Sequence, residues 1–411
     1  MEYLHLFKTK TEHDSFYNGN KYKEPWLAYI RDNTLVTGNK SYDYYRNEYL
    51  TIEVLDDGEI TITITSDVNA TYATYLSYSK DKSNWTPTTI DSTDQTITIP
   101  VSRGDNVYLK GEAKQWSYRG GYMNISSTTN FIASGNIMSL LYGDNFKDNV
   151  KFTEGSNSNF VQLFEDNEHL INAENLILPA TTLAESCYQF MFSGCTSLTT
   201  APTLQATTLD YGCYGSMFMG CTSLTKTPKL PAATLKLNCY EKMFQGCSSL
   251  KAAPALPATT LAQYCYSSMF EGCTSLTKTP KLPATELTIG CYDSMFNGCS
   301  SLTTAPELPA TELVQRCYCF MFQDCTALTT APLLPATTLA IYCYQSMFSG
   351  CSKLSSITML ATDISANGCL KNWVSGVAST GTFTKATSMT SLPSGASGIP
   401  SGWTVVDYTA A

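Results

Sequence analysis

The sequence is poor in the residues that most often carry catalysis and charge-driven binding. Its 411 residues include only three histidines, and charged residues make up 15% of the chain. The formal net charge is −9, whereas nucleic-acid binding needs a basic face. We therefore expect a protein that does not bind nucleic acid.

Long apolar runs are also missing. No stretch of 18 apolar residues is present, so we expect no insertion into a membrane. The N-terminus, MEYLHLFKTKTEHD, lacks the basic segment and apolar core of a secretory signal. We therefore expect a protein that is made in a cytoplasm and stays there, or leaves by another route, such as inside a virus particle.

Catalytic signatures are absent as well. G-x-S-x-G, H-E-x-x-H, P-loop and dinucleotide-binding patterns do not occur. Glycoside hydrolysis would need two convergent carboxylates, but the acidic residues of the repeats described next change position from copy to copy. We expect neither an enzyme nor a cofactor.

Cysteine, in contrast, is abundant and strictly periodic. All sixteen cysteines lie between positions 187 and 369, and motifs such as CYQSMFSGC (343–351) recur every 26 residues. A fixed period of this length is typical of a solenoid, whose coils stack like residues upon each other. The expected repeat core consists of Cys187, Met191, Phe192, Cys195 and Leu198, with their equivalents in other copies.

Each coil is predicted to hold a short helix, a turn and a short extended segment. Leu183, Cys187 and Met191 recur at intervals of four, which is typical of the apolar face of a helix. Gly194 suits the end of that helix, and Pro202 excludes helix beyond it. The predicted fold class is therefore α+β.

For the paired cysteines, a helix would place the two Cα atoms roughly 12 Å apart. A disulfide needs less than about 7 Å. Zinc binding and catalysis lack a histidine or base that repeats with the cysteines. We favour buried free thiols stacked in columns, and disulfides between coils remain the alternative.

Both ends of the array depart from the repeat. The segment from Asn159 lacks the cysteines and has two extra residues, and near the other end Trp373 and Val374 replace Met-Phe. Solenoids need altered ends that cover apolar surface. We expect a cap that begins at Asn159 and a C-terminal tail that covers the last coil.

The first part of the chain predicts a small antiparallel β-sandwich over residues 47–150. In LTIEVLDDGEITITIT, two alternating runs meet at Asp56-Asp57-Gly58, which predicts a hairpin. Segments 71–87 and 96–113 predict further strands. The solenoid with its caps is expected over 151–400, followed by a tail over 401–411.

Residues 1–46 form a separate N-terminal segment that is rich in aromatic residues. It is too short for a large core, so we expect it to pack on the sandwich or dock on another chain. YLHLF predicts a short strand, and Thr9 with Glu12 predicts the start of a short helix. The candidate attachment residues are Tyr3, Leu4, Leu6, Phe7, Phe16, Tyr17, Trp26 and Tyr29.

The MFxGC motif and its following leucine resemble the BspA-type leucine-rich repeats of bacterial surface proteins, over about residues 160–400. The longer form CYxxMFxGCTSLTxAPxLPATTL is similar to repeats of gut Bacteroidales and their phages. The opening YLHLFKTKTEHDSFYN, with YKEPWLAYI, resembles the N-terminal segment of virion structural proteins of Bacteroides phages, including crAss-like phages.

This resemblance implies a virion fibre or decoration protein of the head or tail, made in the host cytoplasm. Its N-terminus would bind other virion proteins, and its solenoid would contact a host surface protein or glycan. A homo-oligomer is expected, with a trimer favoured. The alternative is a bacterial cell-surface adhesin. The candidate surface contacts are Lys226, Lys229, Lys278 and Lys281, although such a face is more often simply solvated.

Overall fold

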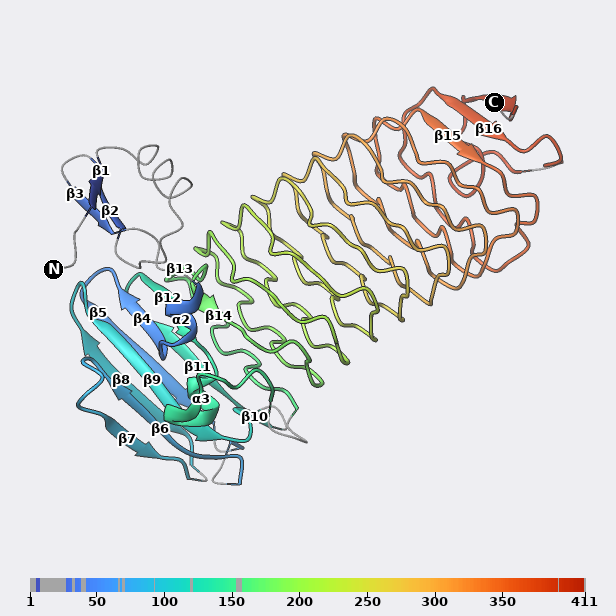
Figure 1. Cartoon of the computed structure of the whole chain (residues 1–411). Coiled ribbons are helices and arrows are strands. Elements are labelled where there is room, and N and C mark those ends of the chain that lie inside the picture. The colour runs from blue at the N-terminus through green and yellow to red at the C-terminus, as the bar shows by residue number, and fades with distance from the viewer. Residues whose placement is uncertain are drawn as a thin grey trace.

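The computed structural model describes the chain from His5 to Thr409 with gaps. Its parts are a β-rich N-terminal region and a rod of stacked coils, joined end to end (Figure 1). The described residues are 5–7, 27–31, 34–37, 42–65, 67–68, 71–91, 93–118, 121–152, 157–390 and 392–409.

A small three-stranded sheet lies in the N-terminal segment. β1 (His5–Phe7) pairs in parallel with β2 (Leu27–Arg31), and β2 pairs antiparallel with β3 (Thr34–Thr37). β1 corresponds to the strand predicted from YLHLF. The short helix predicted from Thr9 and Glu12 lies outside the described residues.

Two larger sheets make up the β-rich region, and their apolar faces share one core. Ile52 and Leu109 of the first sheet and Ile62 and Ile125 of the second are fully buried in it. The first sheet contains β4 (Leu50–Val54), β6 (Ala73–Ser79), β7 (Thr86–Thr89), β9 (Asn106–Ala113), β12 (Phe131–Asn136), β13 (Leu170–Asn172) and β14 (Leu176–Ile177). The second contains β5 (Gly58–Ile64), β8 (Gln95–Val101), β10 (Ser117–Tyr118) and β11 (Gly121–Ser127).

Helix is scarce in the described residues of this region. α2 (Tyr42–Arg46) precedes β4, and α3 (Ser139–Tyr142) runs directly into the 3-10 turn η1 (Gly143–Asn145). The Trp116 indole donates to the carbonyl oxygen of Leu140 at 2.8 Å. This bond fixes α3 to the segment between β9 and β10.

The hairpin predicted at Asp56-Asp57-Gly58 is wrong, although both of its strands are present. β4 pairs with β9 and β12, whereas β5 pairs with β8 and β11 in the other sheet. The connection crosses between sheets because both strands bury their apolar faces in the shared core. The Asp57 carboxylate accepts the N–H of Arg103 at 2.8 Å and so joins the crossing to a neighbouring turn.

The predicted α-helix of each coil is also wrong, and with it the α+β class. Between residues 157 and 390 the structure forms no helix. In the coil from Cys213, odd-numbered residues bond within the coil, as Met217 N–H does to the oxygen of Tyr214 at 3.2 Å. Even-numbered residues bond to the next coil, as Phe218 N–H does to the oxygen of Met243 at 2.9 Å.

This arrangement, the turn ribbon, covers residues 184–195 and their equivalents. It repeats every four residues, with two facing the core and two facing outward. Gly212, Ser216 and Gly220 have φ values of 59°, 55° and 74°, which lie in the left-handed region. A right-handed α-helix excludes such values, so the spacing of four that suggested helix reflects successive turns instead.

Extended segments complete each coil and pair in parallel with their neighbours. Isolated bridges join Leu178 to Leu204 and Thr182 to Thr208. At the C-terminal end the pairing lengthens into a parallel sheet of β15 (Ser356–Met359), β16 (Thr382–Lys385) and β17 (Thr404–Asp407). Stacked extended segments and turn ribbons thus give mostly β and irregular structure, with a 26-residue period.

Aromatic rings and thiols stack along the inside of the rod. Consecutive rings of the tyrosine column, from Tyr188 to Tyr344, and of the phenylalanine column, from Phe164 to Phe348, have centroids 5.4–6.2 Å apart. All sixteen cysteines are free and buried, as the favoured interpretation expects. The helix-based distance argument no longer applies, however. Instead, thiols such as that of Cys247 donate to a carbonyl of the preceding coil, that of Phe218, at 3.1 Å.

The two ends of the array are covered by different means. At the N-terminal end, β13 and β14 pair in parallel with β12, so a sandwich sheet continues into the rod. Ile125 donates its N–H to the oxygen of Leu163 at 2.7 Å, and the Asn124 amide donates to that of Glu165 at 3.2 Å. The cap expected from Asn159 is therefore fused to the sandwich.

At the C-terminal end the tail folds over the last coil, as predicted. The Trp373 indole donates to the oxygen of Gly398 at 2.8 Å. The N–H groups of Asn372 and Val374 bond to the Ser397 hydroxyl at 2.9 Å and to the oxygen of Ala396 at 3.1 Å. The tail thus accepts the hydrogen bonds that a further coil would have accepted.

Candidate binding surfaces

The rod carries a row of apolar side chains along one outer edge. Tyr211, Leu237 and Ile341 are 40%, 41% and 44% exposed, and Ile289 is half-buried at the equivalent position. Bonds between coils hold these positions in register, as from Gly212 N–H to the oxygen of Leu237 at 3.0 Å. We call Tyr211, Leu237, Ile289 and Ile341 the apolar ridge.

Beside the ridge, two tyrosines lie against glycines of the following coil. A Cβ built on Gly290 would lie 2.3 Å from Cε1 of Tyr264, and a Cβ on Gly368 would lie 2.3 Å from Cε1 of Tyr342. Both glycines have positive φ, 61° and 62°. Each ring therefore fills the space that a side chain on the next coil would need, and both rings stay half-buried.

An ion pair lies between the coils of these two tyrosines. Nε and Nη2 of Arg316 approach the same oxygen, Oδ2 of Asp293, at 2.9 and 2.7 Å. The other oxygen accepts the Ser294 hydroxyl at 2.9 Å. The side chain of Asp293 is 7% exposed and that of Arg316 is 34% exposed. The buried carboxylate thus fixes a guanidinium at the rod surface.

The pKa values of this pair follow from its position. Burial raises the pKa of the Asp293 carboxyl above its ordinary value, although Arg316 and Ser294 act in the opposite direction. Burial alone would lower the pKa of Arg316, but Asp293, Cys319 and Tyr264 have the opposite effect and outweigh it. The net pKa of Arg316 is therefore raised. The guanidinium therefore stays charged at the rod surface.

The four candidate lysines are all exposed in the extended segments of two coils. Lys226 bridges Thr200 in the preceding coil, and Lys278 bridges Ala252. Lys229 and Lys281 follow three residues later in the same coils. The four lysines thus form two pairs, separated by a coil that carries alanine at both positions.

The predicted repeat-core residues are placed inside the rod. Cys187, Met191, Phe192, Cys195 and Leu198 each have 0% exposure. Of the candidate attachment residues, Leu6 and Phe7 belong to β1 and Tyr29 to β2. The remaining ones, Tyr3, Leu4, Phe16, Tyr17 and Trp26, lie outside the described residues.

A comparison with protein families identifies the coils. Residues 168–303 and 263–372 match the model of the BspA type leucine rich repeat region, in six copies. The rod is a BspA-type leucine-rich-repeat region. This match confirms the expected repeat type and carries no information on a phage origin. No curated protein and no solved structure matches the chain.

Leucine-rich-repeat regions of this type are typically non-catalytic, in line with the expectation of no enzyme. Within the described ranges, no group of three or more histidine, cysteine, aspartate or glutamate side chains could hold a metal ion. No helix among those residues is long and apolar enough to cross a bilayer.

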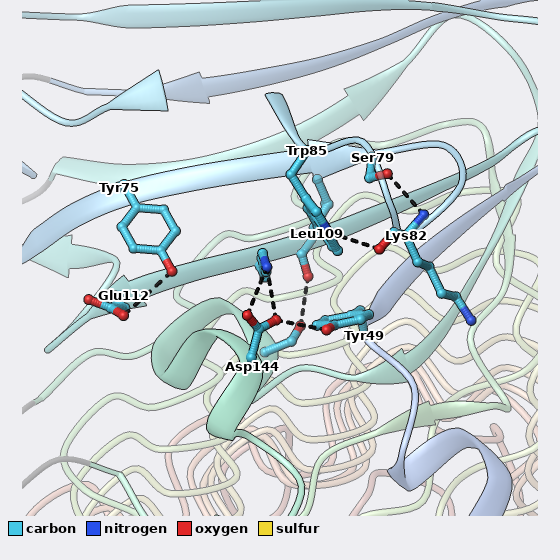
Figure 2. Close-up of polar contacts among 10 residues, drawn as sticks. Tyr49, Tyr75, Ser79, Lys82, Trp85, Leu109, Glu112 and Asp144 are labelled. Carbon is cyan, nitrogen blue, oxygen red and sulfur yellow. Dashed lines mark hydrogen bonds and ion pairs between the residues drawn. The ribbon is translucent and has the colours of Figure 1, made fainter. Parts of the chain in front are cut away.

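Outside the leucine-rich-repeat region, a polar and aromatic cluster covers the first sheet of the sandwich (Figure 2). Lys110 on β9 contacts both carboxylate oxygens of Asp144, at 2.8 and 3.0 Å, and lies 4.1 Å from the centroid of the Trp85 ring. The Tyr49 hydroxyl donates to Asp144 at 2.7 Å. Tyr75 and Glu112 lie at the edge of the same cluster, where the Tyr75 hydroxyl donates to Oε1 of Glu112 at 3.5 Å.

These contacts set the protonation behaviour of the cluster. Hydrogen bonds from Lys110 and Tyr49 lower the pKa of the Asp144 carboxyl. Burial and the bond to Asp144 raise the pKa of Tyr49 to about 12. Because Asp144 belongs to η1 and Lys110 to β9, the cluster fastens the turn after α3 to the sheet. We interpret it as a structural clasp between the two elements.

Sequence reasoning missed the apolar ridge and the tyrosines beside it. Those positions vary between copies, and a helix model gave no reason to expect them outside. One signal was available: the residue before the first cysteine is glycine in every third copy, at Gly212, Gly290 and Gly368. Tyr264 precedes Gly290 by one repeat, as Tyr342 precedes Gly368.

Proposed function

We propose that this protein is an adhesive rod. It attaches the particle or cell that carries it, its bearer, to a surface through the outside of the leucine-rich-repeat region. The observation that carries this proposal is the apolar ridge, whose side chains are exposed in register along the rod. Aligned apolar side chains on an exposed face are typical of interaction sites. The sandwich closes one end of the rod and leaves its outer faces accessible (Figure 1).

The proposed mechanism is multivalent contact. The ridge offers apolar side chains at whole-coil spacings, with Gln263 and Gln315 between them, so one rod can make several weak contacts with a repetitive surface. Many copies on one bearer would then bind far more tightly than a single rod, because each later contact forms at high effective concentration. The exposed residues Lys226, Lys229, Lys278 and Lys281 would add contacts on a second face.

We further propose that the bearer is a virion, to which the N-terminal segment attaches. Support comes from the resemblance of the opening YLHLFKTKTEHDSFYN to virion structural proteins. Other virion proteins would be its partners, in a homo-oligomer that is expected to be a trimer. The repeat type itself equally suits a bacterial cell-surface adhesin, which is the second candidate.

Peptide mass spectrometry distinguishes the two bearers. Gradient-purified phage particles are compared with the outer membranes of uninfected host cells. Peptides from YLHLFK and CYQSMFSGC in the particles would support the virion. Finding them only in the membranes would establish the adhesin instead.

The adhesive role is tested with the purified full-length protein on whole bacterial cells. We expect Leu237→Asp together with Ile341→Asp to reduce cell binding at least tenfold, because both place charge on the ridge. Thr303→Asp is the matched control, since Thr303 is exposed in an extended segment away from the ridge. Equal binding by all three proteins would exclude the ridge as the contact surface.

A further inference from the structure

We propose that Tyr264, Arg316 and Tyr342 form a binding site for an extended, uncharged glycan that lies along the rod. This inference rests on the proposed adhesive function and names the class of its ligand. The site spans four successive coils, in which the residues before the first cysteine are Tyr264, Gly290, Arg316 and Tyr342.

The two tyrosine rings offer apolar platforms at fixed positions. Each is held against the glycine of the following coil, where a Cβ would approach Cε1 to 2.3 Å. The Tyr342 hydroxyl is held further by the Asn367 amide, which donates to it at 3.3 Å. A sugar ring has one or two C–H faces that pack on an aromatic ring, and a fixed ring loses little conformational entropy on binding.

Arg316 supplies oriented hydrogen-bond donors between the platforms. Its Nε and Nη2 are taken by Asp293, and in the part of the chain that the structure describes, Nη1 has no hydrogen-bond partner. Guanidinium N–H groups donate well to hydroxyl oxygens, and the paired fork cannot rotate freely. Because the buried carboxylate balances the charge, the pair does not favour an anion over a neutral sugar.

The geometry selects a long ligand over a compact one. Tyr264 and Tyr342 are three coil steps apart, or about 14 Å if coils stack at the spacing of strands. A ligand that contacts both rings must therefore run parallel to the rod axis. Ile289, Gln315 and Ile341 follow the same line one residue away. Their alternation of aliphatic and amide side chains matches the C–H faces and hydroxyl edges of an oligosaccharide.

The test applies the full-length protein to a printed array of oligosaccharides. We expect the wild type to bind a set of related neutral glycans, and Tyr264→Ala or Tyr342→Ala to weaken this binding at least tenfold. Tyr→Phe at either position should retain it, because the ring and not the hydroxyl makes the contact. Arg316→Gln should weaken binding without changing which glycans are bound.

Tyr408→Ala is the matched control, since Tyr408 is also half-buried but lies in the tail. Melting curves of every variant separate lost binding from lost folding. No glycan bound by the wild type, or binding at the wild-type level by both Tyr→Ala variants, would overturn the site.

A second readout separates this inference from the adhesive role. Cells are treated with periodate, which cleaves vicinal diols of sugars, or with a protease. Cell binding that survives periodate and is lost with protease would mean a protein ligand, so the glycan site would be wrong and adhesion would stand. Array binding without any cell binding would leave the glycan site in place and refute the adhesive rod.

Discussion

Thiols inside the rod are held by their surroundings. Cys247 donates to the carbonyl oxygen of Phe218, and the same bond recurs in other coils, for example from Cys273 to Phe244 at 3.1 Å. Burial raises the pKa of Cys239 and of Cys273 to about 12. Since the thiolate is the reactive form, these side chains should behave as small apolar residues.

We therefore expect the folded protein to resist thiol reagents. Iodoacetamide at pH 8 should leave the sixteen cysteines unmodified over an hour, as counted by intact mass. The same treatment in guanidinium chloride should modify all of them and serves as the control. Rapid modification of the folded protein would mean that the coils open readily or that the thiols are less buried.

The elements of the rod depend on left-handed residues at every fourth position of the turn ribbon. Gly290 combines a φ of 61° with the contact to Tyr264, whereas Gly220, with a φ of 74°, has its nearest neighbour atoms 3.7 Å from a built Cβ. A substitution at Gly220 would therefore add backbone strain alone, whereas one at Gly290 would add backbone strain and overlap with the Tyr264 ring.

Gly220→Ala should lower the free energy of unfolding by about 1–2 kcal/mol, the cost of a left-handed alanine. Gly290→Ala should lower it more, because the Tyr264 ring must also move. Adding Tyr264→Ala to Gly290→Ala should recover the difference. Denaturant titration of the wild type, Gly290→Ala, Tyr264→Ala and the double variant would measure it as a coupling energy. Equal losses for the two glycine variants would contradict the ring contact.

The clasp between η1 and β9 predicts a dependence on pH. The folded-state pKa of Asp144 is lowered, so its ionised form stabilises the protein above the ordinary aspartate pKa. This stabilisation is lost as the pH falls through the folded value. Because the Asp144 side chain is 62% exposed, the effect is expected to be about 1 kcal/mol or less.

Asp144→Asn should accordingly melt below the wild type at pH 7, and the difference should shrink toward zero below about pH 3. Asp148→Asn, at an exposed position nearby, is the control and should show no such convergence. A constant difference across this range would mean that the carboxylate charge is not what stabilises the clasp.

Sequence patterns predicted the elements unevenly, for physical reasons. A spacing of four fits a helix and a ribbon of turns equally well over the nine residues from Cys187 to Cys195. Likewise, Asp56-Asp57-Gly58 suits a hairpin or a crossing between sheets, and only the core shared by β4 and β5 decides. The changed end of the array was predictable, since Trp373 and Val374 replace a strictly repeated Met-Phe pair. The tyrosine site was not, because outward positions depend on the ribbon geometry.

The whole molecule behaves as a one-dimensional stack, in which each coil contacts its neighbours. At its end, Trp373 covers the last rings, with centroids 6.5 Å from Tyr344 and 6.2 Å from Phe348. At the other end the sandwich is joined to the rod through backbone pairing. Stability should therefore be lost locally when one end is damaged.

Trp373→Ala should cost about 3–5 kcal/mol of local stability. Hydrogen exchange followed by mass spectrometry should show faster exchange in residues 343–390 and no change in residues 50–136. Trp85→Ala, in the clasp of the sandwich, is the reciprocal control and should leave the C-terminal coils unchanged. Faster exchange throughout the chain would show that the rod unfolds as a single unit.

The hydrogen bonds between turn ribbons also give the rod a polarity. Each ribbon donates N–H groups toward its C-terminal neighbour, so a bare rod would present acceptors at one end and donors at the other. At the N-terminal end, Asn124 and Ile125 donate to the free carbonyl oxygens of the first coil. At the C-terminal end, Ser397 and Ala396 accept the free N–H groups of the last coil. Two bare rods would fit head to tail, and such a contact does not close on itself. The sandwich and the tail are thus chain terminators, which keep a self-complementary monomer from growing into a fibre.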